Sequence, residues 1–244
     1  KQQKIQSAST KLAKKTNVII YRIFLVSIIL FVMVGASSLY GVVSGLIDNA
    51  PSIENIDVAP TGYATYVYNS DGKMVQSLVG SNANREFVSI DKIPEVVQQA
   101  FIAIEDERFY EHNGIDVRGI FRSFFTGLAS GSFSQGASTL TQQLLKNQVF
   151  NGGNEANFIV KLERKIQEQY LAIQLEDTMS KEKILENYLN TINLGANTLG
   201  VQVASKRYFN KDVSKLNLSE AAVIAGITQS PTNLNPITNP EANA

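Results

Sequence analysis

The feature that most constrains this chain is an uncharged, apolar stretch that runs from Ile23 to Ile47. A helix of roughly 20 apolar residues spans the hydrocarbon core of a bilayer. The apolar region of a secretory signal peptide is shorter, about 7–15 residues. The stretch therefore predicts a retained transmembrane anchor over residues 23–47, and a cleaved signal peptide is the alternative.

The charges that flank this stretch predict its orientation. Six basic residues precede it, and the first acidic residue of the chain is Asp48. They are Lys1, Lys4, Lys11, Lys14, Lys15 and Arg22. The positive-inside rule then makes residues 1–22 a cytoplasmic basic tail and places the rest of the chain outside. The rest of the chain contains 16 Lys and Arg residues and 22 Asp and Glu residues. This excess of negative charge argues against binding to nucleic acid.

Two residue types limit the chemistry. The chain has no cysteine, which excludes disulfides, thiolate zinc sites and cysteine nucleophiles. Its single histidine, His112, argues against a histidine-rich metal site. The sequence predicts no metal ligands.

The segment after the anchor is polar and carries Pro51 and Pro60, which predicts a linker over residues 48–61 and a domain over 62–244. A run rich in aromatic and β-branched residues follows at 63–68, and after the turn signal of residues 69–72 a second, apolar run covers 73–79. This pattern predicts a β-hairpin.

The remaining sequence predicts helices. We expect them from Pro94 to near 112–114, over 117–129, from Ser138 to about 149, through a long segment from Phe158, from Ser180 to about 189, and near 201–208 and 219–228. The long helix has one apolar stripe, formed by Phe158, Ile159, Leu162, Ile166, Tyr170 and Ile173. Residues 130–136 predict a mobile loop. The fold class is therefore mainly α, with a small N-terminal β-hairpin, preceded by a single transmembrane helix.

Residues 105–116 hold five carboxylates and the only histidine. Glu105 follows Ile104 at the edge of the apolar face, where partial desolvation suits a general base or acid. The alternative is a solvated helix end with His112 as its C-terminal cap.

Two further clusters indicate anion binding. Residues 135–143 form a glycine-bearing entry to a helix, with hydroxyls at 138, 139 and 141 and Lys146 one turn later. Free N–H groups at such an end bind phosphate, although an ordinary capped helix start has the same pattern. Lys161, Arg164, Lys165 and Glu168 lie close together on the long helix. They either grip phosphate or form a solvated, ion-paired face. Together the clusters indicate transfer chemistry on a phosphorylated, lipid-linked substrate.

Five segments in order resemble a known family: residues 105–116, 136–143, 164–168, 181–190, and 218–226 followed by Gln229-Ser230-Pro231. They resemble the peptidoglycan glycosyltransferase domain of glycosyltransferase family 51, found in class A penicillin-binding proteins and in monofunctional transglycosylases. The resemblance covers about residues 62–236 and the anchor. It implies a lysozyme-like fold with a membrane-facing lobe, in the bacterial cell membrane.

The resemblance implies an activity and a site. The activity is the polymerisation of lipid II into β-1,4 glycan strands with inversion, with the growing glycan on undecaprenyl pyrophosphate as donor. Glu105 matches the family's general base and Glu168 its second acid. The residues matching the binding site for pyrophosphate and the antibiotic moenomycin are Ser138, Thr139, Gln142, Gln143, Lys146, Arg164 and Lys165. Implied partners are membrane lipid and cell-wall and division proteins, and Mg²⁺ or Mn²⁺ is expected at the diphosphate.

The sequence departs from the family in two places. Ala137 stands where the family usually has glycine, and the chain ends at Ala244, which predicts a truncation before a transpeptidase domain. Two alternatives to the implied activity stay open. One is a glycan-cleaving muramidase or lytic transglycosylase, because similar folds with a catalytic Glu serve both reactions. The other is a non-catalytic, membrane-anchored cell-wall scaffold.

Overall fold

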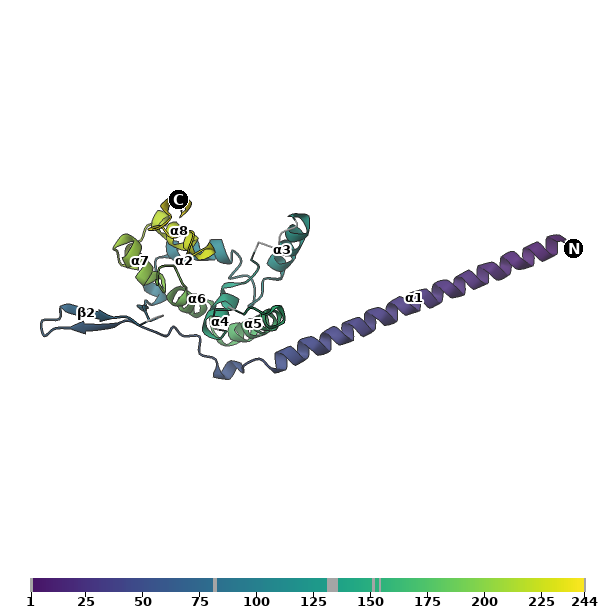
Figure 1. The fold of residues 1–244 in the computed structure, drawn as a ribbon, viewed down its shortest axis with the longest axis horizontal. Helices are drawn as coiled ribbons and strands as arrows, with labels where there is room; N and C mark the ends of the chain where they lie inside the picture. Colours follow the sequence, from purple (N-terminus) through teal and green to yellow (C-terminus); the bar gives the residue numbers. More distant parts are fainter. Residues whose placement is uncertain (1, 81–82, 131–135, 151, 154, 244) are drawn as a thin grey trace. The chain divides into compact units, whose positions relative to one another are not determined.

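The computed structural model describes residues 2–80, 83–130, 136–150, 152–153 and 155–243 (Figure 1). The chain divides into two compact units, residues 1–49 and 50–244. Residues 131–135, on which the predicted mobile loop falls, lie outside the described residues.

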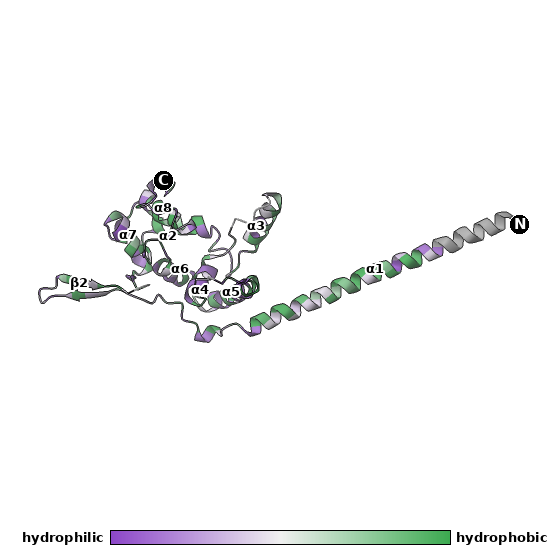
Figure 2. Ribbon diagram, in the orientation of Figure 1, coloured by the Kyte–Doolittle hydropathy of each residue, from purple (hydrophilic) through white to green (hydrophobic). Residues whose placement is uncertain are grey.

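The first unit is one long helix, α1 (Gln2–Asp48). It is the only helix in the described part of the chain that is long and apolar enough to cross a membrane, with a mean hydropathy of 2.6 over its best window of 18 residues. None of that window is buried, and Figure 2 shows the apolar residues along most of the helix. The helix fits the predicted single-pass membrane anchor.

The second unit contains the predicted hairpin. β1 (Thr65–Tyr68) pairs antiparallel with β2 (Met74–Leu78), with Tyr66 opposite Ser77. The turn between them ends at Gly72, whose φ of +75° suits glycine. Most side chains of both strands are exposed.

Helices are the main regular structure of the second unit, which confirms the predicted mainly α class. They are α2 (Glu95–Glu105), α3 (Val117–Ser130), α4 (Leu140–Gln148), α5 (Phe158–Thr178), α6 (Lys181–Thr191), α7 (Val201–Phe209), α8 (Leu218–Gly226) and α9 (Pro240–Asn243). Short 3₁₀ turns occur at η1 (Ile53–Asn55), η2 (Ile90–Lys92), η3 (Val213–Lys215) and η4 (Ile227–Gln229). α9 and the 3₁₀ turns are too short for a periodic pattern to predict.

The core surrounds α6, in which every residue from Ile184 to Thr191 is buried. α4 packs against both α5 and α6, and α2 packs against α8 (Figure 1). The core also includes Val58, which is 1% exposed and lies within the predicted linker. Ile53 and Ile56 pack against this core as well, so part of the segment 50–61 is held against the domain.

Two predicted helix limits are wrong. α2 ends at Glu105, seven residues or more before the predicted end, because Asp106 leaves the helical conformation with φ of −159°. The carboxylate of Asp106 accepts hydrogen bonds from the backbone N–H of Leu140 and from His112, which fixes this turn. The cap of α4 is Thr139 rather than Ser138, since the Thr139 hydroxyl accepts the N–H of Gln142.

The apolar stripe of α5 does not face the core over much of its length. Phe158, Ile159 and Leu162 are exposed. The buried positions are Gln167, Glu168, Leu171, Ala172 and Leu175. Periodicity identifies an apolar face but not which face a neighbouring helix covers, and here α4 covers the face that carries Glu168.

Candidate active site

Three elements converge on the carboxylate of Glu105, the last residue of α2. Its Oε2 accepts a hydrogen bond from Nε2 of Gln143 on α4 at 2.8 Å. Its Oε1 accepts from the hydroxyl of Thr228 and, at 3.2 Å, from Nε2 of Gln229, both on η4. Thr228 and Gln229 are not among the predicted site residues, although Gln229 begins the Gln229-Ser230-Pro231 segment that resembles the family.

The carboxylate lies at an open cleft of about 640 Å³. The cleft is lined by Ile104, Glu105, Arg122, Gly136, Ser138, Gln143, Lys146, Thr228 and Gln229. Glu105 is the only one of the five clustered carboxylates among these lining residues. A cavity of about 670 Å³ beside residues 86–94 shares no lining residue with the cleft and contains none of the predicted site residues.

The side-chain ammonium of Lys146 places a positive charge at the cleft. Its side chain is half-buried on α4, and its ammonium makes no hydrogen bond or ion pair with the residues that the structure describes. Burial lowers the pKa of Lys146, with Lys165 and Arg164 acting in the same direction and Glu168 and Glu105 opposing them. A half-buried, unpaired ammonium favours an anionic ligand.

Glu168 lies behind the cleft with a fully buried side chain. One oxygen pairs with Arg164, and the other accepts from Nζ of Lys165 at 2.8 Å. Lys165 also donates to the hydroxyl of Ser138 at 2.8 Å, which connects this network to the cleft wall. Glu168 therefore holds two cations in place, and its oxygens are both engaged by them.

Arg164 is fixed on two further sides. Its Nε donates to Glu155 at 3.0 Å. The backbone of Gly153 lies directly against the guanidinium: a Cβ at this position would be 2.8 Å from Cζ, and φ is +73°. Only glycine leaves this space open.

Thr139 and Gln142, predicted to bind substrate, are buried at 1% and 2% exposure. The Thr139 hydroxyl and the Gln142 amide both donate to the carbonyl of Gly114, at 2.8 and 3.4 Å. The first N–H of α4, that of Leu140, already donates to Asp106 at 2.9 Å. The start of α4 is thus engaged within the protein, whereas Ser138, Gln143 and Lys146 face the cleft.

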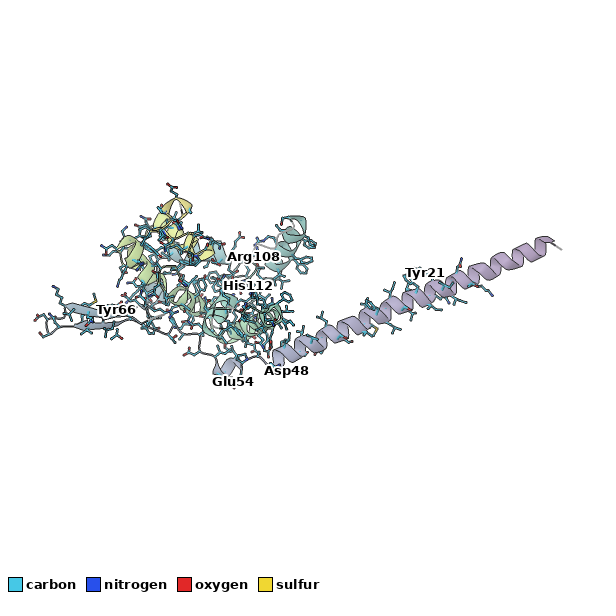
Figure 3. The ribbon with its side chains drawn as sticks, in the orientation of Figure 1. Tyr21, Asp48, Glu54, Tyr66, Arg108 and His112 are labelled. Atoms are coloured by element: carbon cyan, nitrogen blue, oxygen red, sulfur yellow. The ribbon has the colours of Figure 1, made fainter. Side chains whose placement is uncertain are left out.

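The rest of the acidic cluster shapes the segment between α2 and α3, where Figure 3 labels Arg108 and His112. Nε2 of His112 contacts both oxygens of Asp106, at 2.9 and 3.0 Å. Arg108 pairs with Asp116. His112 therefore joins a buried pair instead of capping the C-terminus of α2.

The described residues contain no group of three or more His, Asp or Glu side chains able to hold a metal ion. Glu168 cannot add a ligand, since its oxygens are engaged by Arg164 and Lys165. The described part of the site does not fit a metal held by the protein alone.

The fold and the site together define a helical domain with a carboxylate and several cations at one cleft, preceded by an apolar helix. The family model described as Transglycosylase matches residues 71–244, so the chain belongs to this family.

The comparisons also give relatives. The chain is 42% identical over 214 residues to penicillin-binding protein 1A of Clostridium tetani (strain Massachusetts / E88), covering 86% of this chain and 26% of the relative. It is 39% identical over 214 residues to penicillin-binding protein 1A of Escherichia coli (strain K12), covering 88% and 24%. The chain thus spans about a quarter of the length of these relatives. A crystal structure of penicillin-binding protein 1A from Haemophilus influenzae aligns with a TM-score of 0.38 and 21% identity, over 76% of this chain and 17% of that one.

Proposed function

We propose that the second unit is a peptidoglycan glycosyltransferase that polymerises lipid II into β-1,4 glycan strands. The observation that carries the proposal is the position of Glu105, a carboxylate at the cleft with the unpaired Lys146 beside it. A base next to cations suits transfer from a diphosphate-linked donor to a sugar hydroxyl. Membership of the transglycosylase family and the similarity to penicillin-binding proteins 1A support the same activity.

In the proposed reaction, Glu105 takes the proton from the 4-hydroxyl of the acceptor sugar. The hydroxyl oxygen then forms a bond to the anomeric carbon of the donor with inversion. The bond from that carbon to the diphosphate breaks, and undecaprenyl pyrophosphate leaves with the electron pair. Lys146, together with Lys165 held by Glu168, offsets the charge that develops on the diphosphate.

Mg²⁺ or Mn²⁺ fits this site only as a companion of the substrate. Because the described residues offer no ligand cage, we propose that such a cation arrives bound to the diphosphate oxygens. No step of the reaction above depends on it. Titration with EDTA tests this. Removal of the cation should raise the KM for lipid II, because diphosphate binding weakens, and should leave kcat unchanged.

We propose that α1 anchors the protein with its N-terminus in the cytoplasm and the second unit outside. The basic residues before the apolar stretch support this orientation. Membrane lipid is a proposed partner of the exposed apolar side chains on α3 and α5, which include Phe121, Phe124, Phe125, Leu128, Phe158 and Ile159. Cell-wall and division proteins stay proposed partners.

The test is polymerisation of labelled lipid II by the wild-type chain and by Glu105→Gln. We expect the variant to lose about 100-fold or more in rate, the scale of a lost general base. Glu111→Gln is the matched control, because this carboxylate of the same cluster is exposed and does not line the cleft. Wild-type activity in Glu105→Gln would contradict the assignment. Shortening of preformed glycan without polymer would instead establish a glycan-cleaving enzyme.

A further inference from the structure

The two oxygens of the Glu105 carboxylate have different kinds of partner. Oε2 faces a side-chain amide, Nε2 of Gln143, at 2.8 Å. Oε1 faces the hydroxyl of Thr228, with the exposed amide of Gln229 farther away at 3.2 Å. A hydroxyl both donates and accepts, whereas an amide N–H only donates.

The amide on the Oε2 side is held in one orientation. The hydroxyl of Tyr188, a fully buried side chain, donates to Oε1 of Gln143 at 3.5 Å. Burial raises the pKa of Tyr188 well above its ordinary value, and the charges of Glu105 and Asp106 add to this. Because the ionised Glu105 carboxylate can only accept, the amide of Gln143 keeps its N–H toward Glu105 and its oxygen toward the hydroxyl of Tyr188.

The hydroxyl on the Oε1 side has a choice of acceptor. Besides Glu105, it lies 2.8 Å from the carbonyl oxygen of Ala225. A hydroxyl has one proton and two acceptor lone pairs, so it can serve only one of these oxygens as a donor at a time. While Glu105 is ionised, the charge favours donation to Oε1.

We propose that Thr228 is a positioning residue whose hydroxyl reverses when Glu105 takes up the substrate proton. This inference rests on the function proposed above. The acceptor's O–H bond breaks and its proton joins Oε1 of Glu105. The hydroxyl of Thr228 rotates to donate to the carbonyl of Ala225 and accepts the new O–H of Glu105. No bond of Thr228 breaks, and loss of the proton to water restores the first arrangement.

Several other charged or titratable groups lie near Glu105. Asp106 follows it in the chain, Lys146 of α4 and Tyr188 of α6 interact with its charge, and Arg122 of α3 lines the same cleft. The substitutions used as tests leave all of them in place.

The first test is the pH dependence of lipid II polymerisation for wild type, Thr228→Val and Thr228→Ser. In Thr228→Val the ionised carboxylate loses a charge-assisted hydrogen bond, whereas the protonated carboxyl loses only a weaker, neutral one, so the acid-side fall in rate should move up by about one pH unit. Thr228→Ser keeps the hydroxyl and should keep the fall at its wild-type pH. A wild-type profile in Thr228→Val, or the same shift in both variants, would overturn the proposal.

Thr178→Val is the matched control. Its hydroxyl also bonds to a carbonyl three residues earlier, that of Leu175 at 3.1 Å, and among the described residues it donates only to backbone carbonyls. The control should leave the pH profile unchanged, and melting curves of all variants establish that they are folded. A shift in Thr178→Val equal to that in Thr228→Val would count against a specific role for Thr228.

A second measurement does not depend on activity. In protein labelled with ¹³C at the glutamate carboxyl carbon, the Glu105 resonance is assigned by its loss in Glu105→Gln and is followed against pH. Its midpoint should rise by about one pH unit in Thr228→Val and stay in place in Thr228→Ser. An unchanged midpoint in Thr228→Val would refute the role of Thr228. Failure of the wild type to polymerise lipid II would refute only the proposed function.

Discussion

Arg164 and Lys165 both form ion pairs with the buried Glu168. Lys146, by contrast, has no ion-pair partner among the described residues. Its pKa is lowered, chiefly by burial, so its positive charge is lost at a lower pH than that of an ordinary lysine. A bound diphosphate favours the charged form and so binds best below that pH.

The first prediction concerns alkaline pH. The KM for lipid II should rise as pH increases through the lowered pKa of Lys146, because the ammonium loses its proton and no longer attracts the diphosphate. Lys146→Arg keeps its charge throughout this range and should show a flatter KM profile, measured from initial rates. Equal slopes in the two proteins would show that another group controls donor binding.

The second prediction distinguishes a role of Thr139 in stabilising the fold from a role in binding the substrate. Thr139→Ala removes the cap of α4 and the bond to Gly114, and should lower the free energy of unfolding by about 1–2 kcal/mol. The KM for lipid II should change little, since Thr139 is buried and its hydroxyl is engaged by Gly114 and Gln142 within the protein. A large rise in KM at unchanged stability would support the contact that the family resemblance implies for Thr139.

Sequence periodicity predicted the existence of most helices but not their ends or their covered faces. Thr139 and Ser138 are both good caps, and only the position of Gly114 decides between them. α2 ends early because Asp106 bonds to a helix start 34 residues farther along the chain, which no local pattern reveals. The sequence predicts Glu105 as a site residue. Its contact with Thr228, which is 123 residues away, depends on the packing of α2 against α8 and is not visible in the sequence.

The third prediction concerns the turn beside α5. Gly153→Ala should displace the guanidinium of Arg164 and raise the KM for lipid II, because the new Cβ would lie 2.8 Å from Cζ. Gly72→Ala is the matched control: its φ is +75°, but nothing lies within 4 Å of the added Cβ. Both variants should lose about 1 kcal/mol of stability from backbone strain. If both change KM equally, Arg164 is not the cause.

The whole molecule contains two units, and the fourth prediction concerns where the second one begins. Val58 is buried in its core, and Ile53 and Ile56 pack nearby. In the full chain, Val58→Ala should lower the free energy of unfolding of the second unit by about 1.5–3 kcal/mol, as measured by denaturant titration. Val75→Ala is the control, because Val75 is 60% exposed. Equal small losses would show that residues 50–61 act as a free tether.

The unpaired ammonium of Lys146 has a consequence for the empty protein. A half-buried charge without a partner disfavours the folded state, so occupation of the cleft should raise the melting temperature by mass action. Inorganic pyrophosphate at 100 times its Kd should raise the free energy of unfolding by about 2.7 kcal/mol. This corresponds to an increase of several degrees in the melting temperature of a domain of this size. Lys146→Met should melt higher than wild type without ligand and respond less to pyrophosphate. The proposed enzyme would then be least stable between catalytic cycles, and a supply of substrate would protect it from unfolding.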